Sequence, residues 1–244
     1  MRGIYILLKK ELSETFSSPL IYILTALLSA LMGWLFYNYL IAASHLTELS
    51  LSDSVLKPLF GNMNFIFLFL APLVTMKMFA GEKRQHTLEL LFLSHLNDYQ
   101  IILGKFLTAT LSIVFMLSFT LIFPLILAFS GFQDWGFIFS AYMGIILSVM
   151  CYIAVGLFTS SLTNNQILAA ISAFCLLMTS LLLVITSNAI NNFIVAQIFE
   201  YMSIPFHFDS FVQGSVTSYN VVFFFTFFVF FIFMTAKSLN SRRW

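Results

Sequence analysis

Charged side chains are scarce in this sequence, and their scarcity excludes a large class of proteins. Only 9% of the 244 residues are Asp, Glu, Lys or Arg, whereas 60% are hydrophobic. A soluble domain carries about 25% charged residues, because its surface must stay hydrated. The sequence is therefore not that of a water-soluble globular protein. Its net charge of +1 provides no field that would attract nucleic acid, so we expect no nucleic-acid partner.

Patterns that carry catalysis or bind metal are lacking too. Cys151 and Cys175 lie within apolar stretches, and the four histidines never approach the spacing of a zinc site. The sequence has no G-x-S-x-G and no phosphate-binding G-x-x-x-x-G-K-[ST]. Its only Gly-Lys pair, Gly104-Lys105, is followed by Phe106. We therefore expect no catalytic site, no metal and no cofactor in this chain.

Long apolar blocks are what the sequence has instead. At a rise of about 1.5 Å per residue, a helix built from each block can cross a hydrocarbon core of about 30 Å. We expect an all-α membrane protein with a single transmembrane domain over residues 1–244, and Pro124 predicts a kink in the third helix. The six predicted spans occupy roughly residues 19–43, 62–80, 100–130, 136–159, 166–186 and 219–238.

Two segments outside these blocks have helical patterns of their own. Residues 1–18 place Lys9 and Lys10 opposite an apolar face, which predicts an amphipathic helix lying in the headgroup plane. That face consists of Ile4, Tyr5, Leu8, Leu12 and Phe16. Residues 187–218 contain a weakly amphipathic stretch before Pro205, which predicts an extracytoplasmic helix that is either interfacial or re-entrant.

The basic residues predict the orientation of the spans. With the N-terminus inside, ten of the eleven Lys and Arg residues lie at the cytoplasmic side, and only Lys57 lies outside. Acidic residues divide evenly, so the asymmetry is the one described by the positive-inside rule. We expect both termini to be cytoplasmic. Lys77, near the cytoplasmic end of the second block, is predicted to extend its amine to the headgroups rather than to contact substrate.

The first cytoplasmic loop is longer than a hairpin between two spans requires. Over residues 82–95, Leu88, Leu91 and Phe92 share one helical face and the charged residues share another. This pattern predicts a short amphipathic helix on the cytoplasmic surface. An ordinary solvated loop is the alternative.

This loop resembles the coupling-helix segment of ABC-2 type transporter permeases. The resemblance rests on Glu82-Lys83-Arg84-x-x-Thr87-Leu88-Glu89-Leu90-Leu91, followed by Asp98-x-Gln100-Ile101-x-Leu103-Gly104-Lys105. The segments 18–22 and 156–166 also match the family, and residues 208–243 are similar to its gliding-motility branch. His86 stands where the family usually has Gly, and Leu96 stands where Pro is common.

The resemblance implies an energy-coupled permease with a type V exporter-like transmembrane domain in the bacterial inner membrane. It implies that two such subunits, identical or paralogous, form a dimer in the lipid bilayer. Each would dock on a separate ABC ATPase subunit, which holds the ATP and Mg. The residues expected at the ATPase-coupling interface are Glu82, Arg84, Thr87, Leu88, Glu89, Leu91 and Phe92.

The resemblance leaves alternatives for the activity itself. The permease would couple ATP hydrolysis either to export or to work on a surface apparatus. One rival is a secondary transporter or channel, although the spans contain almost no acidic residue that could relay protons or bind sodium. The other is a membrane anchor for a surface or motility machine without solute transport.

Overall fold

The computed structural model describes residues 2–44, 51–87, 97–129, 134–187, 189–190 and 192–241. Within these ranges the regular structure is helical and contains no strand. Six helical stretches are long and apolar enough to cross a membrane, which confirms the predicted fold class. They are Pro19–Ser44, Ser52–Arg84, Asp98–Phe129, Trp135–Leu162, Gln166–Ser187 and Ser218–Asn240.

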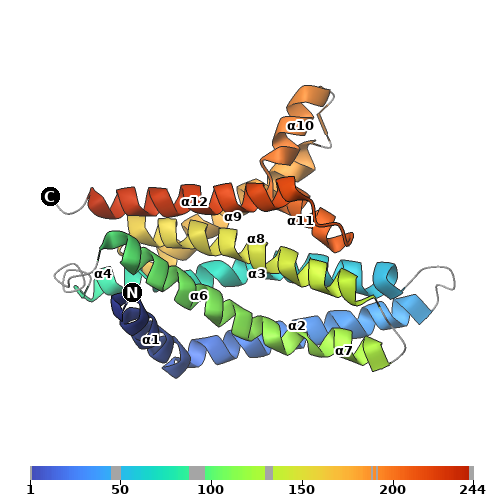
Figure 1. The fold of residues 1–244 in the computed structure, drawn as a ribbon, viewed down its shortest axis with the longest axis horizontal. Helices are drawn as coiled ribbons and strands as arrows, with labels where there is room; N and C mark the ends of the chain where they lie inside the picture. Colours follow the sequence, from blue (N-terminus) through green and yellow to red (C-terminus); the bar gives the residue numbers. More distant parts are fainter. Residues whose placement is uncertain are drawn as a thin grey trace.

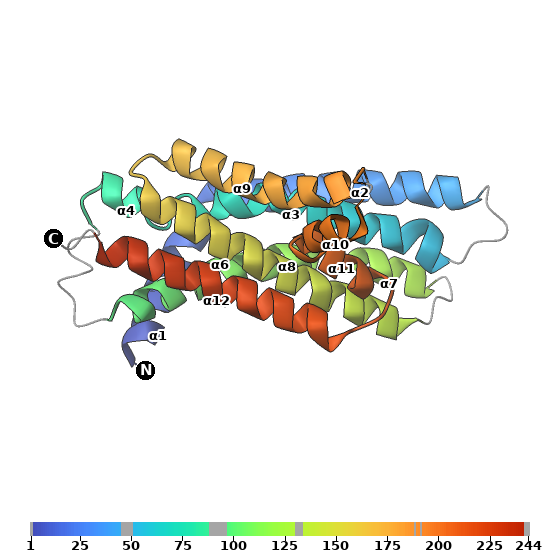
Figure 2. The ribbon, with the colours of Figure 1, turned by 90° about the horizontal axis from the view of Figure 1, so that it is seen from above.

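The spans form an elongated bundle in which both ends of the chain lie at the same end as α4 (Figures 1 and 2). Helix α8 (Trp135–Leu162) is the most buried span and packs against α3, α9 and α12. Gly156 lets α8 approach α3 closely, because a Cβ there would collide with Thr75. The remaining long helices are α2 (Pro19–Ser44), α3 (Lys57–Thr75), α6 (Asp98–Thr120), α9 (Gln166–Ser187) and α12 (Ser218–Asn240).

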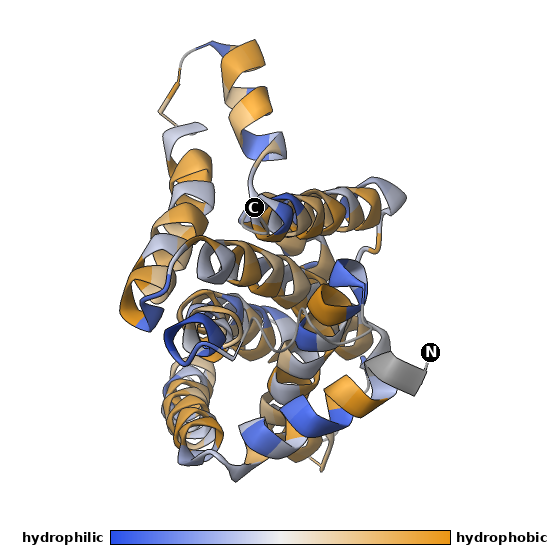
Figure 3. Ribbon diagram, turned by 90° about the vertical axis from the view of Figure 1, so that its left-hand side faces the viewer, coloured by the Kyte–Doolittle hydropathy of each residue, from blue (hydrophilic) through white to orange (hydrophobic). Residues whose placement is uncertain are grey.

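The outward faces of the bundle are apolar, as a lipid-facing surface requires. Ile23, Phe139 and Phe225 are among the large apolar side chains that point outward. Figure 3 views the molecule from the end that carries both termini, and hydrophilic residues are conspicuous there on the helix beside the N-terminus. The distribution fits a bundle whose length crosses the membrane.

The predicted N-terminal helix is present as α1 (Arg2–Ser17), and it packs against α6. Leu7 and Glu11 of α1 are buried, and Gly104 of α6 leaves the space that the Leu7 side chain fills. Tyr5 and Ile6 are exposed. The helix is therefore docked on the protein by one face while other apolar residues remain available to lipid.

The second span differs from its prediction at both ends. It begins at Ser52 rather than near residue 62, because η1 (Ser52–Leu56) continues directly into α3. The helix is then interrupted by a turn over residues 76–79, and α4 (Ala80–Arg84) follows. The length of the apolar block did not predict the extension, because the added residues include the charged Asp53 and Lys57. It did not predict the interruption either.

The third span is broken as Pro124 predicted. Helix α6 ends at Thr120, and α7 (Ile122–Phe129) begins after Leu121. Proline cannot donate the backbone hydrogen bond that would continue to the carbonyl of Thr120. The structure thus interrupts the helix where the kink was predicted.

Two short helices lie between the fifth and sixth spans. Helix α10 (Phe193–Tyr201) projects away from the bundle (Figure 1), and its first turn is capped by the Asn192 side chain, which accepts from the amide of Ile194. Helix α11 (Ile204–Val212) returns to pack against α8, with Phe211 fully buried. The helix predicted before Pro205 is confirmed.

Candidate functional site

A buried ionic cluster joins three separate elements at the end of the bundle that carries α4. The amine of Lys105 on α6 lies 2.8 Å from Glu11 Oε1 on α1 and 2.7 Å from Glu82 Oε1 on α4. The Lys105 side chain is 1% exposed, and those of Glu11 and Glu82 are 7% and 18% exposed. Its amine also lies 5.5 Å from the centre of the Phe79 ring. One cation thus links α1, α4 and α6.

The burial of this cluster makes its three members interdependent. Removing one partner of a buried ion pair typically costs about 3–5 kcal/mol, because the remaining charge is left uncompensated in a poorly solvated site. Among the described residues, Lys105 is the only cation within 3 Å of the carboxylate of Glu11 or of Glu82. A displacement of Glu82 must therefore displace Lys105 or break the cluster.

A hydroxyl group of α8 forms hydrogen bonds with the turn that interrupts the second span. Because α4 begins anew at Ala80, its first backbone N–H groups have no partner within the helix. Ser160 Oγ accepts from the amides of Phe79 and Ala80 at 3.2 and 3.0 Å, and donates to the carbonyl of Met76 at 3.2 Å. Lys83 adds a second tie, since its amine donates to the carbonyl of Ser161. The start of α4 is thereby fixed to α8.

The end of α4 is a Schellman turn. The amide of His86 donates to the carbonyl of Lys83 at 3.2 Å, and that of Thr87 donates to the carbonyl of Glu82 at 3.0 Å. His86 has a φ of 56°, the left-handed conformation that glycine usually supplies at this position. The chain therefore leaves α4 at a defined angle.

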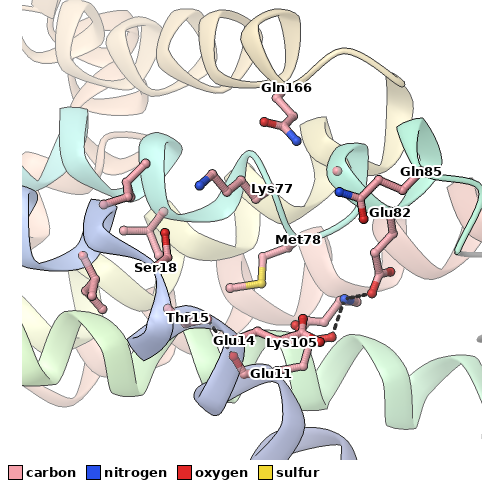
Figure 4. A pocket seen from close by; sticks show the side chains of 14 residues that line it. Glu11, Glu14, Thr15, Ser18, Lys77, Met78, Glu82, Gln85, Lys105 and Gln166 are labelled. Carbon is pink, nitrogen blue, oxygen red and sulfur yellow. Dashed lines mark hydrogen bonds and ion pairs between the residues drawn. The ribbon is translucent and has the colours of Figure 1, made fainter.

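Two cavities lie along α3 and α9. The first, of about 240 Å³, adjoins the ionic cluster and is lined by residues of α1, α2, α3, α4, α6 and α9 (Figure 4). The second, of about 610 Å³, lies nearer the opposite end of α3, between α3, α8, α9 and α11. Asn64 and Tyr152 form a buried hydrogen bond of 3.2 Å in its wall. Phe69 of α3 and Phe174 of α9 are in ring contact, 4.7 Å between centroids, and lie between the two cavities along both helices.

The profile of the family described as ABC-2 family transporter protein matches residues 50–207. This range covers more than half of the chain and includes α3, α4, α8, α9 and Lys105 of the ionic cluster. The chain belongs to the ABC-2 transporter family. It is therefore a multi-pass membrane permease component of an ABC transporter, and such components are generally non-catalytic partners of an ABC ATPase. No curated protein matches the chain.

The structure describes only part of the coupling segment predicted for this permease. Arg84 and Thr87 are exposed, in keeping with a docking role. Glu82 is different, because its carboxylate points inward to Lys105, so its assignment to the docking surface is corrected. The other predicted interface residues, which lie outside the described residues, are Leu88, Glu89, Leu91 and Phe92.

The single helix predicted over residues 82–95 is wrong across residues 85–87. Helix α4 ends at Arg84, and the left-handed turn at His86 prevents it from continuing. Gly81 does not end a helix, because it is buried inside α4 beside Gln166. Residues 88–95 lie outside the described residues.

Sequence reasoning missed the partners that hold α4. Glu11 had no predicted role, although its spacing of four residues from Leu7 places both on the face that packs against α6. Ser160 gave no signal, because one serine in a small-residue stretch of a span usually serves helix packing. Lys105 belonged to the family pattern, but nothing in its spacing indicated which carboxylates it meets.

Proposed function

We propose that this permease is the membrane subunit of an ATP-driven exporter of the gliding-motility type, in which residues 84–95 receive the ATPase and α4 passes its motion to the spans. The observation that carries the proposal is the contact of one buried lysine, Lys105, with both Glu82 on α4 and Glu11 on α1. The similarity of residues 208–243 to the gliding-motility branch supports the choice of branch.

The contacts of α4 explain how a displacement of this helix would be transmitted to the spans. Its start is bonded to Ser160, its middle to Lys105, and its last turn, through Lys83, to the end of α8. A displacement applied to the segment that follows α4 would therefore move α1, α6 and α8 together. Such a unit can transmit force because buried ion pairs and hydrogen bonds resist separation.

The docking surface itself is proposed from the sequence. Leu88, Leu91 and Phe92 would bury in a groove of the ATPase, and Arg84 and Glu89 would pair at its edge. Buried apolar anchors usually supply most of the binding energy of an interface, whereas charges at the rim act more on the association rate. ATP and Mg would remain on the partner, and a second copy or paralogue of the permease would complete the dimer.

The two cavities support transport of a solute over a purely anchoring role. They lie at opposite ends of α3, and Phe69 and Phe174 are in contact at positions between them along α3 and α9. An exporter needs separate inner and outer spaces of this kind, whereas an anchor does not. Movement of α4 and α3 relative to α9 would part the two rings.

The experiment is co-purification of the permease with its ATPase, followed by measurement of ATP hydrolysis in reconstituted membranes. The double variant Leu91→Ala/Phe92→Ala should lose the ATPase while it still inserts and dimerises, because truncating an anchor typically costs more than about 1 kcal/mol. Glu89→Ala should retain more bound ATPase than the double variant and should lower the permease-stimulated rate of ATP hydrolysis. If the double variant binds the ATPase and stimulates hydrolysis as the wild type does, this segment is not the coupling element.

The ionic cluster can be tested in the same assay. Lys105→Met should keep the ATPase bound but lose the stimulation of hydrolysis by the permease, because α4 is no longer tied to α1. Lys237→Met is the matched control, since Lys237 is an exposed lysine near the same end of the bundle. Folding is checked by gel filtration of both variants. Normal stimulation in well-folded Lys105→Met protein would contradict transmission through the cluster.

A further inference from the structure

The smaller cavity is lined by a cation that no carboxylate of the described residues neutralises. Lys77, in the turn between α3 and α4, is exposed and lines the cavity. Among the described residues, no carboxylate or hydrogen-bond partner contacts its amine, in contrast to Lys105, which contacts two carboxylates. Gln166 of α9 lies on the same side of the cavity in Figure 4. This side can therefore bind an anion.

The opposite side of the cavity carries carboxylates with unused acceptor capacity. Glu14 contacts only Lys10, at 3.5 Å, in a pair whose side chains are 60% and 62% exposed. Glu82 also lines the cavity, but its Oε1 binds Lys105 and its Oε2, which has no partner within the described residues, is shielded from solvent. Figure 4 shows Glu11 and Glu14 across the cavity from Lys77 and Gln166. The cavity thus presents complementary sites for an anion and a cation.

The surroundings of the cavity are those of a membrane–water boundary. Leu20 and Ile21 of α2 and Val74 of α3 form its apolar wall, and Ile23 of α2 is exposed on the outer surface. The amphipathic α1 lines the cavity with Glu11, Glu14 and Thr15 of its last turns, and such helices lie at headgroup depth. The volume of about 240 Å³ is below the roughly 300–1,000 Å³ of pockets that enclose whole drug-sized ligands. It suits a headgroup whose acyl chains stay outside.

We propose that this cavity binds the headgroup of a phospholipid that carries a primary ammonium, with the phosphate at Lys77 and Gln166 and the ammonium at Glu14. A primary ammonium donates three charge-assisted hydrogen bonds, whereas a trimethylated one donates none. An anionic headgroup without an amine would satisfy Lys77 and add nothing to the long, exposed contact of Glu14 with Lys10. The bound headgroup would brace the turn between α3 and α4.

The test measures lipid binding to the purified full-length permease in detergent by native mass spectrometry. The probes are dioleoyl phosphatidylethanolamine, phosphatidylcholine and phosphatidylglycerol, with free phosphoethanolamine as competitor. We expect phosphatidylethanolamine to bind best, and Lys77→Gln to weaken its binding roughly tenfold or more, as the loss of a charged hydrogen bond implies. Lys77→Arg should retain binding, and Glu14→Gln should reduce the preference over phosphatidylglycerol.

Lys237→Gln is the matched control, since Lys237 is exposed near the same end but does not line the cavity. Equal binding of the three lipids to the wild-type protein would overturn the proposal, and so would equal losses in Lys77→Gln and Lys237→Gln. Displacement of phosphatidylethanolamine by an equal concentration of free phosphoethanolamine would overturn the lipid assignment in favour of a soluble phosphate amine. The measurement needs no ATPase, so it is independent of the proposed coupling function.

Discussion

At the scale of single residues, His86 holds the backbone in a conformation that disfavours any side chain with a Cβ. Its φ of 56° falls in the left-handed region, which costs a residue other than glycine roughly 1 kcal/mol or more. Histidine tolerates this region better than most residues. The permease therefore forms its Schellman turn with a histidine in the left-handed position, at a small cost in stability.

His86→Gly should stabilise the purified permease. Relief of the left-handed strain exceeds the added chain entropy of glycine, so we expect a gain of about 0.5–1 kcal/mol, or a rise in Tm of about 1–4 °C. Gln85→Gly is the control, because Gln85 has a φ of −91°, where glycine adds only unfolded-state entropy and should lower the Tm. The measurement is thermal unfolding in detergent. A lower Tm for both variants would contradict the argument.

At the scale of elements, the interruption between α3 and α4 is held by a hydroxyl from a distant helix. Without Ser160, the amides of Phe79 and Ala80 would lie buried in an apolar span with no acceptor. An unsatisfied buried polar group costs about 1–3 kcal/mol. The turn is therefore a property of the α3–α8 contact rather than of residues 76–79 alone.

Ser160→Ala should loosen this turn. We expect faster hydrogen exchange at the amides of Phe79 and Ala80, together with a loss of about 1–3 kcal/mol in stability. Ser161→Ala is a closely matched control, because the Ser161 hydroxyl donates only to the carbonyl of Phe158 in its own helix, at 2.7 Å. Hydrogen exchange followed by mass spectrometry distinguishes the variants. Equal exchange in both would mean that the hydroxyl of Ser160 does not hold the break.

The elements that could be predicted from sequence are those determined by local composition. The spans from Trp135 and from Gln166 begin within one residue of their predictions, because apolar length alone specifies a membrane helix. The break before α7 was predictable because Pro124 causes it locally. The ionic cluster was not predictable, since Glu11 and Lys105 are 94 positions apart. Only the docking of α1 on α6 brings them together.

At the scale of the whole molecule, both termini and α4 lie at one end of the bundle (Figure 1). That end also holds the ionic cluster and the headgroup-sized cavity, whereas the larger cavity and α11 lie toward the other. Every feature that we assign to coupling is thus gathered at one end. The assignment requires this end to face the ATPase, and hence the cytoplasm.

The orientation can be tested by cysteine labelling in intact cells. Cys175 is the exposed native cysteine, so a Cys175→Ser background removes its reaction, while Cys151 is buried. In that background, Ser52→Cys and Ser215→Cys should react with an impermeant thiol reagent added outside, because the positive-inside rule places them there. Gln85→Cys and Ser241→Cys are exposed positions at the opposite end, and they should react only after the cells are opened. Labelling of Gln85→Cys in intact cells would show that the protein has the opposite orientation. A segment on the outer surface could not bind an ATPase that hydrolyses cytoplasmic ATP, so the coupling assignment would fail with it.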